Sequence, residues 1–247
     1  MSTTATPGAP SPLRPDREQL ATFWRALVLP GDVHEVRITD ARTGGPARLF
    51  GTTAGYFTDE RPFVDVLSRI TGLDAQAVYV TLNPVRPILR ARADNRLVGR
   101  AKATAGDADI ERRRHFLIDV DPGLPAGISA TDAERNAALL VRDAIRAYLA
   151  DAGWPDPLCV GMSGNGGSLV YRIDLPNHPT EDAPDAAEQS LTLVTNCLLA
   201  LGGMFGVADE KSARPGVDTS VANASRITKV FGTVAAKGDD CPHLRRP

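Results

Sequence analysis

HFLIDVDP, at residues 115–122, is the stretch that decides how this chain folds. It opens with a continuous apolar run, as a β-strand buried on both faces would show. The run ends at Asp119 and Asp121, and because side chains alternate along a strand, both carboxylates lie on one face. Two like charges held that close repel each other unless a cation neutralises them, and carboxylate oxygens are the ligands that Mg²⁺ and Mn²⁺ prefer. The alternative is an Asp-Pro turn in which Asp121 only caps a loop.

The segments on either side of this strand predict further helices and strands. Thr131 and Glu134 form a capping box before a helical pattern, and residues 43–46 have the composition of a hairpin turn. The whole pattern is α/β (α+β), and we expect mixed sheets. Apolar spacing predicts helices at about 20–28, 59–72, 131–152 and 187–201, and strands at 33–38, 77–82, 158–162, 168–173 and 226–231.

Composition limits the class of protein. The 247 residues are 43% hydrophobic, which is enough for one large core or two modest ones, and the net charge of −2 excludes a globally basic nucleic-acid coat. Cys159, Cys197 and Cys241 form no CxxC pair, so we expect neither a disulfide framework nor a zinc site. No stretch has the length and apolarity of a membrane span or a signal peptide. We therefore expect a cytoplasmic protein with reduced thiols.

The two ends of the chain differ from its middle. Residues 1–15 are mostly Ser, Thr, Ala, Pro and Gly, which cannot repay the entropy of ordering, so we expect a disordered tail. Residues 16–247 are expected to form a single domain. Residues 242–247 stop without a capping element, and we expect this domain to be part of a longer protein.

Local basic patches are the candidates for contacts with phosphate. A stretch after Asn83 is rich in arginine, and a second run follows at 112–114. The alternative is a solvated surface whose side chains have no ligand. The basic residues of the first stretch are Arg86, Arg90, Arg92, Arg96, Arg100 and Lys102.

A glycine-rich loop and a late aspartate are further candidates. Residues 163–168, SGNGGS, join two predicted strands, and such loops let backbone N–H groups converge on an anion. A plain hairpin turn is the alternative, since Asn-Gly is a strong turn signal. Asp218 precedes Arg226, Lys229 and Lys237, which indicates either a metal ligand beside a triphosphate clamp or an ordinary surface ion-pair network.

The order of these motifs resembles the archaeo-eukaryotic primase superfamily, especially the primase-polymerases of bacterial mobile elements and viruses. The resemblance runs from about residue 78 to 246 and rests on 116–122, 163–166, 217–218 and 226–233. It implies a catalytic core in which an RRM-like antiparallel sheet, within a module at about 106–247, packs against an N-terminal α/β module at about 16–105.

The resemblance also implies roles for the quoted residues. Asp119, Asp121 and Asp218 would be the catalytic carboxylates that hold two Mg²⁺ or Mn²⁺ ions. The partners implied are NTP or dNTP, a single-stranded DNA template with its primer, and a helicase domain or partner. Nucleotide phosphates would be bound by Ser163, Gly164, Asn165, Gly166, Ser168, Arg226, Lys229 and Lys237, and the template by Asn83, Arg86, Arg90, Arg92 and Arg96.

Ser168 departs from the family's pattern. The second motif of the family usually ends in a histidine, and serine is a shorter, uncharged partner for phosphate. Two function classes therefore stay open: a template-dependent nucleotidyltransferase that extends or also initiates primers, and a non-catalytic relative that binds nucleotide or nucleic acid. A sugar-nucleotide transferase using the DxD motif is a third class, which explains neither Asp218 nor the glycine-rich loop.

Overall fold

The computed structural model describes residues 14–42, 49–125 and 127–236. The expected hairpin turn at 43–46, Lys237, Cys241 and most of the expected N-terminal tail therefore lie outside the described residues. The helices are α1 (Arg17–Leu27), α2 (Glu60–Leu67), α3 (Asp132–Asp151) and α4 (Ala186–Phe205), with short 3-10 helices η1 (Pro87–Arg92) and η2 (Asp107–Asp109). The strands are β1 (His34–Ala41), β2 (Gly51–Phe57), β3 (Tyr79–Thr81), β4 (Arg112–Asp121), β5 (Cys159–Met162), β6 (Gly167–Pro176), β7 (Gly216–Val217) and β8 (Ile227–Lys229).

Two four-stranded sheets organise the fold. The first has the order β2-β1-β3-β8 and the second the order β5-β6-β4-β7, and every pairing of neighbouring strands is antiparallel. The α+β class is therefore confirmed, whereas the expectation of mixed sheets is wrong. The reason is that β5 and β6 form a hairpin, so β6 lies between β4 and β5 and the α3 crossover does not bring parallel strands together.

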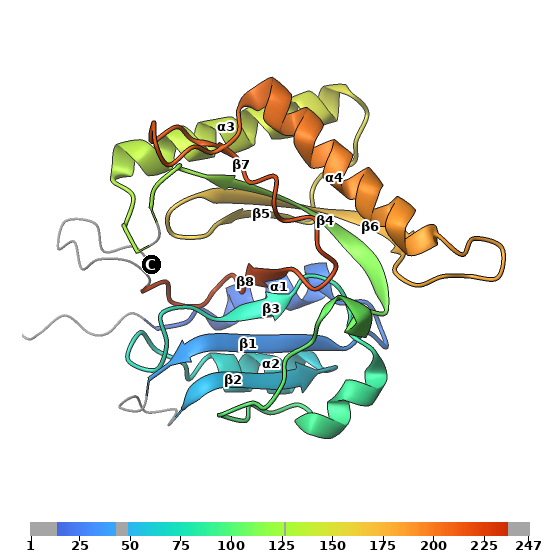
Figure 1. Cartoon of the computed structure of the whole chain (residues 1–247). Helices are drawn as coiled ribbons and strands as arrows, with labels where there is room; N and C mark the ends of the chain where they lie inside the picture. Colours follow the sequence, from blue (N-terminus) through green and yellow to red (C-terminus); the bar gives the residue numbers. More distant parts are fainter. Residues whose placement is uncertain (1–13, 43–48, 126, 237–247) are drawn as a thin grey trace, which may run out of the picture.

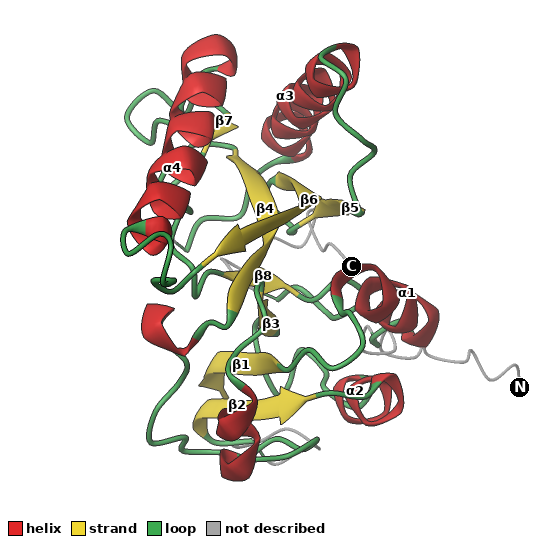
Figure 2. Ribbon diagram, turned by 90° about the vertical axis from the view of Figure 1, so that its right-hand side faces the viewer, coloured by secondary structure: helices red, strands yellow, loops and turns green. Residues whose placement is uncertain are grey.

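Helices cover each sheet on one side. Figure 1 shows α3 and α4 over one face of the second sheet, with the first sheet beneath its other face. Figure 2 shows α1 and α2 together on one side of the first sheet. One cluster of buried apolar side chains extends from Leu20 in α1 through both sheets to Val230 after β8. Within the described residues, no helix has the length and apolarity needed to cross a membrane.

Several elements begin where the local chemistry predicts. The Asp16 carboxylate accepts hydrogen bonds from the first backbone amides of α1. The capping box of α3 is confirmed, since Thr131 Oγ accepts from the Glu134 amide while the Glu134 carboxylate accepts from the Thr131 amide. α2 ends at Leu67, before the stop expected at Gly72, because the following residues form a turn.

The last strand returns to the first sheet. β8 pairs with β3, with Lys229 opposite Tyr79, although it lies in the carboxyl-terminal part of the chain. Just beyond it, Phe231 covers Gly161 of β5 so closely that a Cβ on Gly161 would lie 1.8 Å from the Phe231 ring. The Phe231 ring also packs edge-on against Phe23 of α1, with 5.2 Å between centroids. The segment around β8 therefore joins the two sheets.

Asn83 also joins the layers. Its Nδ2 donates to the Ala224 carbonyl at 2.9 Å, and its Oδ1 accepts from the amides of Arg114 and His115 at 2.8 and 3.0 Å. The residue is 2% exposed, so this amide is engaged in the interior. These contacts do not fit the template contact expected for Asn83: the side chain holds the start of β4 against the loop before β8.

We predict that Asn83→Ala lowers the free energy of unfolding by about 3 kcal/mol, because it leaves the buried His115 amide, the partly buried Arg114 amide and the buried Ala224 carbonyl without a partner. Urea denaturation measures this value. Arg86→Ala, three residues away and exposed, serves as the control and should change stability by less than about 0.5 kcal/mol. A change of similar size in both variants would contradict the structural role of Asn83.

Candidate functional site

A row of side chains crosses the second sheet. Ser168 of β6 lies opposite both Gly161 and Asp119, and the Asp218 amide donates to the Asp119 carbonyl at 2.8 Å, which extends the ladder by one residue beyond β7. Residues directly opposite in an antiparallel sheet present their side chains on the same face, with Cβ atoms about 5 Å apart. Ser168, Asp119 and Asp218 are therefore neighbours on one face.

This face is turned away from the covering helices. Gly167, the residue before Ser168, faces α3, since a Cβ there would lie 2.9 Å from Leu139 Cδ2. Alternation turns Ser168 and Asp119 to the other side, where Phe231 covers Gly161. The carboxylates therefore lie between the two sheets.

The electrostatics of Asp119 show that acids are gathered around it. Burial raises the pKa of Asp119 to about 6, Asp218 and Asp121 raise it as well, and Arg226 opposes the rise. Within the described residues, the Asp119 side chain accepts no hydrogen bond. The structure thus brings all three predicted aspartates within electrostatic reach of one another, as the spacing of the first two predicts.

The other two carboxylates have partners. Asp218 Oδ1 accepts from the Ser220 amide at 2.9 Å and the Ser220 hydroxyl at 2.6 Å, while its Oδ2 lies 3.5 Å from the Arg226 guanidinium. Asp121 Oδ1 accepts from the Gly123 amide at 2.8 Å. The turn alternative for Asp121 is thus realised together with its place beside Asp119.

The first sheet contributes Tyr79 and Lys229. Burial raises the pKa of Tyr79, and Asp40 and Asp119 add to the rise, which places the phenol near the carboxylates. Burial lowers the pKa of Lys229 to about 8. Lys229 as a whole residue is 9% exposed, and its ammonium has no hydrogen bond or ion pair within the described part of the chain. A buried ammonium without a partner favours an anionic ligand.

The glycine-rich loop lies beside the carboxylates. A Cβ on Gly166 would lie 2.1 Å from the Val120 carbonyl, so only glycine permits this approach. Ser163 Oγ accepts from the Gly166 amide at 3.2 Å. Gly164 has φ +106° and lies against Ala235. The loop is a hairpin turn, as the alternative interpretation holds, and its position keeps Ser163 and Gly166 near Asp121.

The Asn165 side chain of this loop bonds to the backbone of a neighbouring segment. Its Nδ2 donates to the Ile128 carbonyl at 2.9 Å, and its Oδ1 accepts from the Ala130 amide at 3.2 Å. The side chain therefore fastens the loop to the segment that leads into α3. These contacts do not fit direct phosphate binding by this amide.

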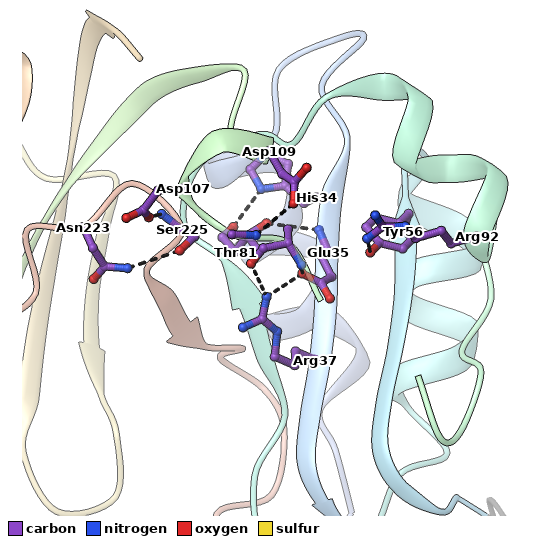
Figure 3. Close-up of polar contacts among 12 residues, drawn as sticks. His34, Glu35, Arg37, Tyr56, Thr81, Arg92, Asp107, Asp109, Asn223 and Ser225 are labelled. Carbon is purple, nitrogen blue, oxygen red and sulfur yellow. Dashed lines mark hydrogen bonds and ion pairs between the residues drawn. The ribbon is translucent and has the colours of Figure 1, made fainter. Parts of the chain in front are cut away.

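The predicted basic stretch lies elsewhere. Arg86 and Arg96 are exposed, while Arg90 forms an ion pair with Asp94 at 3.0 Å. Figure 3 shows Arg92 beside Tyr56, whose hydroxyl accepts from it at 3.2 Å. Figure 1 places η1 at the lower end of the molecule, whereas the carboxyl end of β4 lies in the upper part. The structure does not bring these arginines to the carboxylates.

Figure 3 also shows a polar cluster that sequence reasoning missed. Glu35 is fully buried, and its carboxylate accepts from Arg37 at 2.6 Å and from the Ala105 amide at 2.9 Å. In the same view, the Asp107 carboxylate accepts from the Ser225 amide at 2.7 Å. This second contact fixes the loop between Asp218 and β8, which carries Arg226. No short motif marks these residues in the sequence.

The chemistry of the donor set fits a divalent cation. Asp119 lies near two further carboxylates, and its pKa is raised first by burial and then by Asp218 and Asp121, a rise that a bound cation would reverse. As the side chains lie in this structure, no three Asp, Glu, His or Cys residues within 14–42, 49–125 and 127–236 are arranged to hold one ion. Asp121 Oδ1 and Asp218 Oδ1 accept hydrogen bonds from Gly123 and Ser220, and Asp218 Oδ2 pairs with Arg226.

Searches of protein-family models, of curated proteins and of solved structures find no match to this chain.

We predict that Asp119→Asn stabilises the metal-free protein at neutral pH. The folded pKa of about 6 exceeds the ordinary value of 3.8, so ionisation of Asp119 costs nothing below pH 3.8 and its full penalty above pH 6. The variant should therefore gain up to about 2 kcal/mol at pH 7 and little at pH 4. Denaturation in EDTA at both values measures the difference.

Asp121→Asn is the matched control, since Asp121 is exposed at the end of the same strand. A gain for Asp119→Asn that is equal at pH 4 and pH 7 would contradict the buried, crowded state of this carboxylate.

Proposed function

We propose that this chain is a DNA primase-polymerase of the archaeo-eukaryotic primase type, which adds nucleotides to a primer on a single-stranded DNA template. The observation that carries the proposal is the ladder bond from the Asp218 amide to the Asp119 carbonyl. It places a carboxylate from near the end of the chain beside the DxD motif. The resemblance requires this juxtaposition, and no local pattern produces it.

The carboxylates supply the metal ligands of this proposal. Asp119, Asp218 and Asp121 would hold Mg²⁺ or Mn²⁺, with Asp119 in the middle of the row. Bound divalent ions would acidify the primer 3′-hydroxyl and neutralise charge on the α-phosphate and the leaving pyrophosphate. Above pH 6 Asp119 is mainly ionised, which is the state that a cation requires.

The cations on the facing sheet supply the phosphate contacts. Lys229 is buried without a partner among the residues that the structure describes, and Arg226 is paired at a long distance. Both can therefore donate charge-assisted hydrogen bonds to an arriving triphosphate. Phosphate would in turn restore the ordinary pKa of Lys229. The Ser163 hydroxyl, the backbone of the glycine-rich loop and Ser168 would supply further contacts to the phosphates from the second sheet.

The partners of the proposal are a nucleoside triphosphate and a DNA template with its primer in the cytoplasm, with a helicase as an associated domain or protein. Arg86 precedes η1 and the Arg96 backbone lies against Gly55 of β2, so both exposed arginines lie in the part of the molecule away from the carboxyl end of β4. They remain available for template phosphates outside the site.

A non-catalytic nucleotide- or DNA-binding role is the second candidate. Ser168 favours it, because Asp119 faces a short, uncharged residue across the ladder where the family's histidine would reach phosphate. The engaged oxygens of Asp218 and Asp121 favour it as well. Primer extension run beside a gel-shift on single-stranded DNA separates the two candidates, since the second predicts binding without extension.

We predict that Asp119→Ala abolishes Mn²⁺-dependent primer extension, with a loss of at least about 10³-fold, because it removes the central metal ligand. Extension of a labelled primer with all four nucleotides measures this loss. Asp174→Ala is the control, since this exposed residue pairs with Arg112 at the far end of the sheet. An Asp119→Ala protein with unimpaired extension would remove the metal-dependent mechanism.

We further predict that Ser168→His keeps or raises the rate of extension, because an imidazole beside Asp119 could reach nucleotide phosphate as the family's histidine does. Single-nucleotide incorporation at several nucleotide concentrations measures the effect, which should be a lower KM. Ser168→Ala distinguishes this gain from simple loss of the hydroxyl. If Ser168→His lowered kcat/KM more than Ser168→Ala does, the row would not face the nucleotide.

A further inference from the structure

Arg226 is the cation that lies among the site's carboxylates. Its Nη2 is 3.5 Å from Asp218 Oδ2, and its charge opposes the rise in the pKa of Asp119. It therefore acts on both carboxylates of the row at once. In the absence of a metal ion, this guanidinium neutralises part of the charge that a divalent ion would otherwise neutralise.

The backbone of Arg226 is fixed, whereas its side chain is loosely held. The Arg226 carbonyl accepts from the Leu82 amide at 2.7 Å, and the loop before it is fastened by the Asn83 contact to Ala224 and by an Arg113 contact to the Ala222 carbonyl. The ion pair to Asp218 is longer than the usual 2.7–2.9 Å or so of a charge-assisted hydrogen bond. Arg226 Nε is buried and has no partner within the described residues.

This combination suits a side chain that changes partners. Among the described residues, the guanidinium has one long contact and an unpaired Nε, which leaves most of its five N–H groups for another acceptor. Lys229, on the strand that follows, is a second cation without a partner in the described chain. An anion of several phosphates would satisfy both.

We propose that Arg226 occupies the divalent-ion site of the resting protein and leaves Asp218 for the triphosphate when the ion binds, which couples metal and nucleotide binding. This inference rests on the proposed function. It extends that function by assigning one residue to two successive partners, so that Asp218 is released for the metal only at the cost of displacing a positive charge.

The coupling has a definite direction. A divalent ion that binds alone must displace the Arg226 guanidinium. The two positive charges then repel each other, because no anion neutralises them. A triphosphate that binds alone meets Arg226 still paired with Asp218. When both bind, each removes the other's penalty, so each raises the other's affinity by the same factor.

Titration of the intact chain with Mn²⁺ tests the proposal, with free Mn²⁺ followed by electron paramagnetic resonance. Each titration is run without nucleotide and with a triphosphate analogue whose α–β bridge cannot be cleaved. The chains compared are the unaltered protein, Arg226→Gln, Arg226→Lys, Lys229→Met and Asp119→Asn. Thermal melts confirm that each variant is folded.

Loss of the Arg226 charge is expected to raise the affinity for Mn²⁺ without nucleotide and to reduce the further increase in affinity that the analogue causes. Without nucleotide, Arg226→Gln should bind Mn²⁺ about 3- to 10-fold tighter than the unaltered chain, because the competitor is gone. With the analogue, the increase in Mn²⁺ affinity should be smaller in Arg226→Gln than in the unaltered chain, by a factor of about 5 or more. Arg226→Lys, which keeps the charge, should lie between them.

Lys229→Met is the matched control for charge alone, since it removes a buried cation that has no ion pair to Asp218. If Arg226→Gln binds Mn²⁺ no tighter than Lys229→Met does, or more weakly than the unaltered chain, Arg226 does not compete for the site and the inference is overturned. Mn²⁺ binding that Asp119→Asn leaves unchanged would overturn the proposed function as well, so the two failures are distinguishable.

Discussion

The hydrogen bond from the Asp218 amide to the Asp119 carbonyl is the interaction on which the candidate site depends. It continues the β4–β7 ladder by one residue, and the geometry of an antiparallel pair then places both carboxylates on the same face. On the opposite edge of β4, the pairing with β6 places Ser168 directly beside Asp119. A slip of one residue in either pairing would turn its partner residue towards the covering helices.

Holding these acids together has an energetic cost that the surrounding structure offsets. The pKa of Asp119 is raised mainly by burial, and Asp218 and Asp121 add to the rise; a site that destabilises its own charged groups is typical of a functional centre. The loop that carries Arg226 is fastened by Arg113, Asn83 and Asp107 to the backbone of residues 222–225. This anchoring keeps Asp218 and Arg226 in register although the strands beside them are short.

Local patterns in the sequence predicted the parts of the fold that depend on local chemistry. The capping box at Thr131, the buried strand up to Asp119 and the hairpin of β5 and β6 are all confirmed. Strand alternation alone predicted that Asp119 and Asp121 point to the same face of the sheet. Asp218 was a candidate only through motif order, because β7 has two residues and no periodicity.

What the sequence could not reveal depends on pairing between distant segments. Tyr79 joins the site because β8 pairs with β3, more than a hundred residues away. Asn83 is a typical turn residue before proline, and its burial follows only from the approach of β4 and residue 224. The arginines after Asn83 form a basic cluster in the sequence, yet η1, which carries Arg90 and Arg92, lies away from the carboxylates.

The position of a bound ion tests the central claim most directly. Crystals of the protein grown with Mn²⁺ and a non-cleavable triphosphate analogue give the ion's place from the anomalous scattering of manganese. The account predicts a peak between Asp119 and Asp218, with Arg226 turned to the phosphates. Manganese located away from these carboxylates, or an Arg226 still paired with Asp218 beside bound triphosphate, would contradict it.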